Sequence, residues 1–142
     1  MHVHDPCLTG PENDFLPELE LHDESHGGRF SGGKLGPVAA EHLACALGAN
    51  EVLTSLNLGD NEIGDEGAAH IARALKLNRT LTAIDLYKNG LGDAGAAHVA
   101  AALEVNSTLL SVDMAGNAIG AEPADALRAA WGKRDRSKLI IN

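Results

Sequence analysis

Three histidines recur at a fixed spacing and raise the question of a metal site. His42, His70 and His98 follow one another at equal intervals along the chain. Zinc ligands must all lie about 2 Å from one ion, whereas equivalent positions on neighbouring packed helices are about 8–10 Å apart. We therefore predict that these histidines lie on solvated helix faces and that they bind no metal.

The N-terminal residues offer a second set of potential metal ligands. His2, His4, Asp5 and Cys7 carry donor atoms that suit a borderline metal. The fixed ligand spacing of a structural zinc site is absent, however. A mobile tail that binds no metal is the alternative, and it is the interpretation we favour.

The sequence contains neither a nucleophile motif nor a phosphate loop. Serine, histidine and aspartate all occur, but no G-x-S-x-G elbow presents a serine. The stretch SHGGRFSGGKLG, residues 25–36, contains glycines and Lys34. Leu35 follows this lysine where G-x-x-x-x-G-K-[ST] requires Ser or Thr. We therefore expect no catalytic residue, no cofactor and no enzymatic activity, and we interpret this stretch as an exposed specificity loop.

Composition and charge narrow the class of protein further. The 142 residues suit one domain. Hydrophobic residues make up 44% and aromatic residues only 3%, so a core must be built from Leu, Ile, Val and Ala. The net charge of −9 argues against nucleic acid as a partner.

The sequence also indicates where the protein is located and whether its cysteines form a disulfide scaffold. No run of 18 apolar residues could span a membrane, and the first residues do not form a secretory signal, so we expect a cytoplasmic protein. The two cysteines, Cys7 and Cys45, are too few for a disulfide scaffold. We expect Cys45 to be an inert helix residue.

These side chains must be positioned by an internal repeat. Similar units begin at Leu53, Leu81 and Leu109, and one more step of the same length reaches Ser137. The first half of each unit reads L-x-x-L-x-L-x-x-N, and this alternation predicts a half-buried strand. The second half follows a glycine and places apolar residues four apart, as on one face of a helix.

Local signals define the ends of the expected helices. Asp65 and Asp93 suit N-cap positions, and Pro123 suits a first helical turn. Asn78 and Asn106 suit helix ends, because asparagine tolerates the left-handed conformation.

Stacked units of this kind must curve. Parallel strands lie about 4.8 Å apart, whereas packed helices need about 8–10 Å, so the strands take the inner side. Four columns of equivalent apolar residues are expected to fill the core: Leu53, Leu81 and Leu109; Leu56, Ile84 and Val112; Leu58, Leu86 and Met114; and Ile63, Leu91 and Ile119.

The L-x-x-L-x-L-x-x-N segments, followed by a glycine and a helix that begins D-E-G-A in the first unit, resemble the leucine-rich repeat of the ribonuclease-inhibitor type. The same type occurs in NOD-like receptors and in Ran GTPase-activating proteins. The resemblance covers residues 53–142 strongly and 35–52 well. It implies an α/β solenoid, a short right-handed arc with a parallel sheet on the concave face and helices on the convex face, which binds other proteins on the concave face. The chain has fewer repeats than a full horseshoe and lacks abundant cysteines, so ribonuclease inhibition is not implied.

The start of the repeat domain has two interpretations. LPELELHD, residues 16–23, matches LTSLNLGD, residues 53–60, in every core position, with nine extra residues within 24–33. The alternative is a ragged strand around Phe30, which keeps the phase of the later units. We favour the first, with a mobile tail at 1–15 and a repeat domain at 16–142. Its units would be 16–52, 53–80, 81–108 and 109–136, followed by a partial strand at 137–142.

Residues between the strand leucines are expected on the concave face. The second column there would contain Glu20, Asn57, Asp85 and Asp113, with like charges adjacent. A partner with a basic segment would suit these acids, and Tyr87 has the composition of an interface anchor. The alternative is that the acids are merely solvated. The candidate binding residues are Glu18, Glu20, His22, Asn57, Asp60, Asp85, Tyr87, Lys88 and Asp113.

Other polar positions are expected to serve the fold. Asn61, Asn89 and Asn117 form a column, and the resemblance implies that such asparagines bond to backbone in the turn after the strand. Trp131 occupies the core position of Leu75 and Leu103. An apolar strand that begins at Leu139 could pair with a second molecule, so self-association is one further expectation.

We therefore predict a protein–protein interaction module without catalytic activity, with no nucleic acid or membrane as partner. Regulation of a small GTPase is the alternative, because the resemblance includes Ran GTPase-activating proteins.

Overall fold

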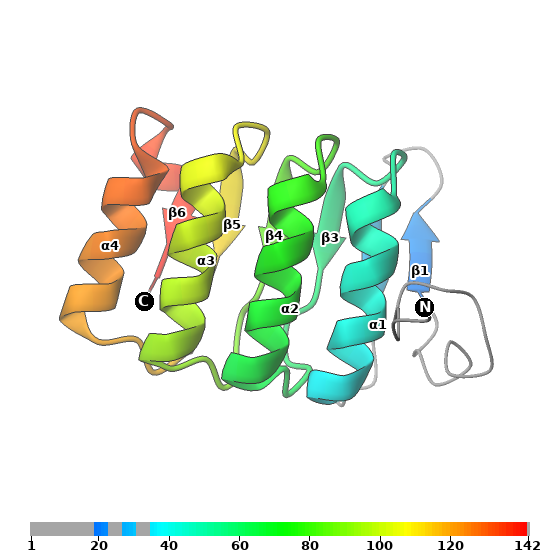
Figure 1. The fold of residues 1–142 in the computed structure, drawn as a ribbon, viewed down its shortest axis with the longest axis horizontal. Coiled ribbons are helices and arrows are strands. Elements are labelled where there is room, and N and C mark those ends of the chain that lie inside the picture. The colour runs from blue at the N-terminus through cyan, green and yellow to red at the C-terminus, as the bar shows by residue number, and fades with distance from the viewer. Residues whose placement is uncertain (1–18, 23–26, 31–34, 142) are drawn as a thin grey trace, which may run out of the picture.

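A computed structural model describes residues 19–22, 27–30 and 35–141, and it describes side-chain surroundings from residue 35 onward. Four helices alternate with short strands along the chain (Figure 1). The helices are α1 (Gly36–Ala49), α2 (Gly64–Leu77), α3 (Asp93–Val105) and α4 (Ala121–Trp131), followed by the 3-10 helix η3 (Arg136–Lys138). The strands are β1 (Leu19–His22), β2 (Gly27–Phe30), β3 (Ser55–Asn57), β4 (Ala83–Asp85), β5 (Ser111–Asp113) and β6 (Leu139–Ile140).

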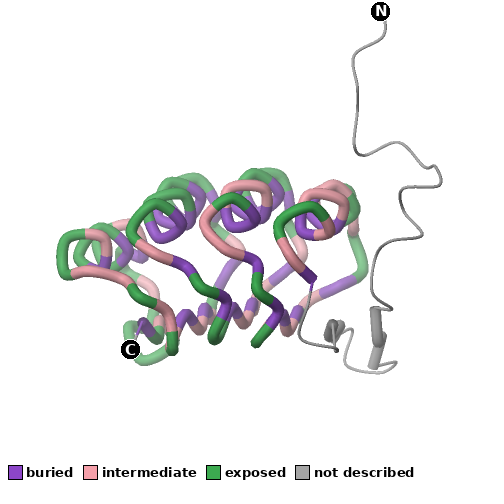
Figure 2. The backbone as a smooth tube through the Cα atoms, turned by 90° about the horizontal axis from the view of Figure 1, so that it is seen from below, coloured by how far each residue is buried: buried purple, intermediate pink, exposed green. Residues whose placement is uncertain are grey.

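The described strands form one sheet in the order β1-β2-β3-β4-β5-β6. Strands β2 to β6 are parallel, and β3, β4 and β5 pair so that equivalent residues of successive units face each other. Figure 2 shows the helices in one row and the strands in another, with the row of helices wider than the row of strands. The predicted α/β leucine-rich-repeat solenoid is therefore confirmed.

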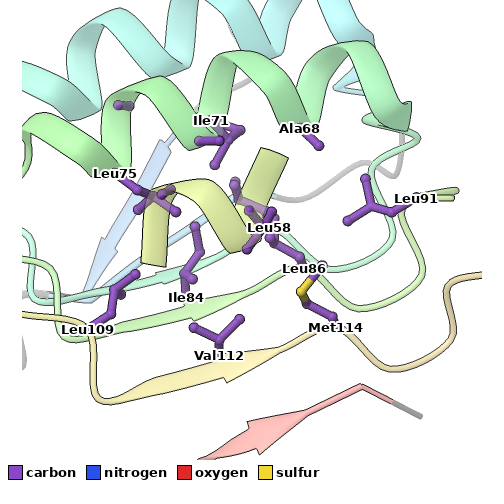
Figure 3. Close-up of a cluster of buried hydrophobic side chains, with 14 of the residues drawn as sticks. Leu58, Ala68, Ile71, Leu75, Ile84, Leu86, Leu91, Leu109, Val112 and Met114 are labelled. Atoms are coloured by element: carbon purple, nitrogen blue, oxygen red, sulfur yellow. The ribbon is translucent and has the colours of Figure 1, made fainter. Parts of the chain in front are cut away.

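The core lies between these two rows. Side chains of the strands meet side chains of the helices there (Figure 3). The predicted apolar columns are buried, apart from Ile119, which is half-buried. Trp131 is 1% exposed, so it does fill the core position that leucine occupies in the two units before it.

The first unit differs from the favoured prediction. Strand β2, not the segment 16–23, pairs in parallel with β3, and Gly27 faces Ser55, the equivalent position one unit later. Strand β1 instead pairs antiparallel with β2 at the edge of the sheet. The placement of the segment 16–23 beside β3 was therefore wrong, and the alternative strand around Phe30 holds. Backbone pairing needs no side chain, so Gly27 and Gly28 can occupy positions where later units carry larger residues.

The last strand keeps the repeat but shortens its step. Leu139 pairs with Val112 and Ile140 with Asp113, so the register is one position shorter here than between the earlier units. Ile141 is buried, whereas Ile140 is exposed on the opposite face. The predicted fifth strand is thus present as β6.

Candidate functional site

The open face of the sheet carries a column of polar side chains across β3, β4 and β5. Asn57, Asp85 and Asp113 are half-buried and are direct neighbours in the strand register. Each side-chain oxygen accepts a hydrogen bond from the backbone N–H two residues later, at 2.8–2.9 Å. These bonds fix the side chains against the strand ends and leave the second carboxylate oxygens of the two acids available.

The surroundings of Asp85 shift the pKa of its carboxyl group. Burial raises its pKa above the ordinary value of 3.8, and the negative charge of Asp113 raises it further. The hydrogen bond from the Tyr87 N–H opposes both effects. Two carboxylates are therefore held side by side where the ionised form of one is disfavoured, so a cation bound at this point would relieve the repulsion.

Tyr87 and Lys88 project beside these acids. Tyr87 is 39% exposed, and the Lys88 Nζ atom lies 5.4 Å from the centre of its ring. Gly116 leaves space for the pair, because a Cβ atom there would lie 2.7 Å from the Lys88 Cγ atom. Asp60 is exposed in the neighbouring unit, and its N–H donates to the Tyr87 carbonyl at 2.7 Å.

The structure thus brings six of the nine predicted binding residues together: Asn57, Asp60, Asp85, Tyr87, Lys88 and Asp113. Glu20 and His22 lie on β1, where they pair with Arg29 and Gly27 rather than with β3. The predicted column that placed Glu20 beside Asn57 was therefore wrong, and His22 is likewise separated from β3 by a strand. Glu18, the predicted tail at 1–15 and the N-terminal residues considered as metal ligands lie outside the described residues.

The asparagine column supports this face from beneath. Asn89 is 1% exposed. Its Oδ1 atom accepts from the N–H of Asn61 at 2.9 Å, and its Nδ2 atom donates to the Leu58 carbonyl at 2.8 Å. Asn117 repeats both bonds one unit later, with Asn89 and Leu86. Each amide therefore connects the turn of one unit to the turn of the next.

A second asparagine ladder occupies the other end of the helices. Asn78 and Asn106 have extended backbones, with φ of −70° and −79°, so the predicted left-handed conformation was wrong. The Nδ2 atom of each donates to carbonyls one unit earlier, at distances of 2.6–3.3 Å. Arg134 occupies the equivalent position in the next unit, where its guanidinium donates to the Leu103 and Asn106 carbonyls. The regular recurrence of Asn50, Asn78 and Asn106 was the signal that could have revealed this ladder.

The two aspartates predicted as N-caps act on a different helix from the one expected. Asp65 and Asp93 lie in the first turns of α2 and α3, and neither caps its own helix. The Asp65 Oδ1 atom accepts from Gly92 N at 2.7 Å and from Gly95 N at 2.8 Å, at the start of α3. Asp93 likewise accepts from Gly120 N at 2.7 Å, at the start of α4. Each of these two units therefore caps the helix of the unit that follows it.

The remaining candidates lie on the helix side. His70 Nε2 is 3.9 Å from Glu41 Oε2, and His98 is exposed. Within the part of the chain that the structure describes, no group of three His, Cys, Asp or Glu side chains could hold a metal ion. Cys45, which we expected to be an inert helix residue, is disulfide-bonded. Across the same described ranges, none of the helices has the length and apolarity needed to cross a membrane.

Comparison with known proteins agrees with this geometry. The family model described as "Leucine Rich repeat" matches residues 49–72, 77–100 and 105–127, which together make up half of the chain. Each match begins near the end of one helix and runs through the following strand into the next helix. No curated protein matches the chain. The chain belongs to the leucine-rich repeat family.

Proposed function

We propose that the protein is a non-catalytic interaction module that binds a partner protein on the open face of β3, β4 and β5. The observation that carries this proposal is the exposed pair of Tyr87 and Lys88 beside the half-buried Asp85 and Asp113. No described helix covers this face, because the helices form a row on the opposite side of the sheet (Figure 2).

The physical properties of this face favour a protein ligand with a basic segment. A rigid aromatic ring supplies contact area at a low cost in conformational entropy. A lysine or arginine of the partner placed at Asp85 and Asp113 would neutralise the like charges and favour the ionised form of Asp85. The backbone bonds of the two aspartates hold them in place before binding, which lowers the ordering cost of association.

A matched pair of double variants tests the role of the two acids. Asp85→Asn with Asp113→Asn removes both charges but keeps the oxygen that accepts the backbone N–H, as Asn57 does in the unit before. Glu66→Gln with Glu104→Gln changes the net charge equally at exposed positions of α2 and α3. Partners are first captured from a cell extract with the wild-type protein, and binding is then measured by calorimetry.

The Asp85→Asn, Asp113→Asn double variant should bind the partner about tenfold or more weakly than the wild type does. The Glu66→Gln, Glu104→Gln double variant should bind like the wild type. Equal affinity of the wild type and both variants would exclude the acid pair as a binding element. If Tyr87→Ala also bound normally, the whole face would be excluded.

We further propose that the repeats are of the ribonuclease-inhibitor subtype. The second candidate function is regulation of a small GTPase. The full helices α2 and α3 in consecutive units support this subtype, since each fills about half of its unit and leaves room for only a short strand. A turnover assay with a panel of small GTPases separates this regulator from a simple interaction module. Faster GTP hydrolysis would favour the regulator, and binding without acceleration would favour the interaction module.

A further inference from the structure

One position in the turn after each of β3, β4 and β5 has a left-handed backbone. Asp60, Lys88 and Gly116 occupy this position in three consecutive units, with φ of 58°, 49° and 76°. Glycine adopts this conformation without a steric penalty, and aspartate tolerates it better than most residues do. A lysine is uncommon there, because its Cβ atom strains the backbone. Gly116 shows that the turn itself does not need the lysine side chain.

The strained turn at Lys88 is held in place from both neighbouring units. The Lys88 N–H donates to the Ala115 carbonyl at 3.0 Å, and the Tyr87 carbonyl accepts from the Asp60 N–H at 2.7 Å. The turn therefore cannot relax without losing hydrogen bonds to the unit before it and to the unit after it. Enforced strain at a position where glycine would serve is typical of a functional residue.

The side chain of Lys88 is positioned without being neutralised. It lies against Gly116, since a Cβ atom there would lie 2.7 Å from the Lys88 Cγ atom and 3.3 Å from the Tyr87 Cε2 atom. The Lys88 Nζ atom lies 5.4 Å from the centre of the Tyr87 ring. Within residues 35–141, no carboxylate lies within 4.0 Å of this Nζ atom. The ammonium group therefore contacts a ring rather than an acid, and it is free to bind an anion.

Lys88 also restricts what the neighbouring acids can bind. Asp85 precedes it by three residues, so the Cα atoms of the two residues lie within about 10–11 Å of each other. A ligand with basic side chains alone would reach Asp85 and Asp113 but would also approach the Lys88 ammonium group, which repels it. A ligand that also brings a carboxylate to Lys88 complements both signs of charge.

We propose that the open face binds an extended partner segment in which a lysine or arginine is two residues from an aspartate or glutamate. The basic side chain lies at Asp85 and Asp113, and the acidic side chain accepts from the Lys88 Nζ atom. In an extended chain, side chains two residues apart point the same way at a spacing of about 6.6 Å, and the long lysine stem spans the remaining distance. This inference rests on the proposed function, to which it adds the recognition of an anion.

Peptide titration of the full chain tests this combination of charges. Three synthetic peptides share one acetylated and amidated sequence of serine and threonine, and differ only at a centre that reads Lys-Ala-Glu, Lys-Ala-Gln or Gln-Ala-Glu. The NMR shifts of the Asp85, Tyr87 and Lys88 amides report binding to the open face. The Lys-Ala-Glu peptide should bind about two- to fivefold more tightly than either of the others. Equal affinity for all three peptides, or no shift with any of them, would overturn the proposal.

Variants of Lys88 assign the acidic side chain of the peptide to this lysine. Lys88→Met removes the charge but keeps a long side chain, so it should abolish the preference for Lys-Ala-Glu over Lys-Ala-Gln. Lys88→Arg should retain that preference. Lys76→Met, at an exposed lysine of α2, is the matched control and should also retain it. A preference that survives in Lys88→Met, or that disappears in the control, would contradict the assignment.

The proposed function and this inference fail in different ways. Asp85→Asn with Asp113→Asn should weaken the binding of both peptides that contain lysine. If this double variant does so while Lys88→Met changes neither affinity, the face binds basic segments and only the role of Lys88 is refuted. If the double variant changes neither affinity, the role of the acid pair and the present proposal are both refuted.

Lys88→Gly separates a functional lysine from a structural one. The substitution relieves the left-handed strain, so the melting temperature should rise by about 2–5 °C, while the preference for Lys-Ala-Glu disappears. Lys88→Met keeps a Cβ atom and should melt close to the wild type. A lower melting temperature for Lys88→Gly than for the wild type would show that the lysine serves the fold, which would overturn the functional interpretation.

Discussion

Asn89 connects two units through a buried amide, and its replacement by alanine gives a sharp test of the ladder. The substitution removes the acceptor for the Asn61 N–H, a fully buried group that donates at 2.9 Å. It also removes a more distant acceptor for the buried Ile63 N–H, at 3.4 Å, and only the N–H with the shorter bond is counted as orphaned. An orphaned buried N–H costs about 1–3 kcal/mol. The Leu58 carbonyl keeps a donor from Asn61 Nδ2, and the Tyr87 carbonyl keeps one from Asp60 N, so neither is orphaned.

Loss of the two bonds that Asn89 Nδ2 donates costs a further 0.5–1.5 kcal/mol each, by the usual net value of a hydrogen bond, or about 1–3 kcal/mol together. Asn89→Ala should therefore lower the free energy of unfolding by about 2–6 kcal/mol. Asn57→Ala is the matched control, because it loses one bond at a half-buried site and should cost about 0.5–1.5 kcal/mol.

Urea unfolding followed by circular dichroism measures both values. Far-ultraviolet spectra without urea establish that each variant is folded, and the slope of the free energy against urea shows whether unfolding stays cooperative. A cost below about 1 kcal/mol for Asn89→Ala, or equal costs for the two variants, would refute the reasoning that the ladder satisfies an otherwise orphaned N–H.

Four further substitutions test the helix ends, the space between α1 and α2, and the acid pair. Asp65→Ala should lower the free energy of unfolding by about 1–3 kcal/mol, because it removes a carboxylate that caps the next helix through two N–H groups. Asp93→Ala should cost less in the same urea assay, since it loses one such bond, and a larger cost would contradict this ranking. Gly48→Ala should raise stability by about 0.5–1 kcal/mol, because the added methyl lies 3.7 Å from its nearest neighbour and favours the helix; a lower melting temperature would show that the space is not available. Asp85→Asn should stabilise the protein by a few tenths of a kcal/mol at neutral pH, because it relieves repulsion with Asp113. The pKa of Asp85 is raised, so the folded state favours its protonated form. The free energy of unfolding of the wild type should therefore fall relative to that of the variant as pH rises through and above 3.8. Identical dependence of the unfolding free energy on pH for both proteins from about pH 3 to pH 7 would contradict this.

Periodicity predicted the parts of the fold that depend on apolar side chains. Leu56, Ile84 and Val112 could be assigned to one buried column because burial leaves a regular mark on the sequence. The partners of polar groups leave a weaker mark. Asp65 looks like an ordinary N-cap, yet the helix it caps is one unit away, and only the stacking of units brings them together.

The same limit explains the error in the first unit. The segment 16–23 matches the leucine pattern of β3 better than the segment 27–30 does, but strand pairing depends on backbone and on position in the stack. On the open face, the sequence placed Asp85 and Tyr87 side by side but gave no sign that the aspartate bonds to the Tyr87 N–H. Chain segments that depend on tertiary pairing therefore could not be derived from local pattern.

Hydrogen bonds join adjoining repeat units at constant sequence separations, and this restricts how an array of such units can gain or lose residues. The amides of both asparagine ladders find acceptors at sequence separations of 28 or 31, in the adjoining unit. Deletion or duplication of one whole unit would leave each remaining asparagine amide with an equivalent carbonyl acceptor. A deletion of any other length would leave several of these amides without an acceptor at once. Growth and shrinkage by complete modules are thus the changes that this architecture tolerates best.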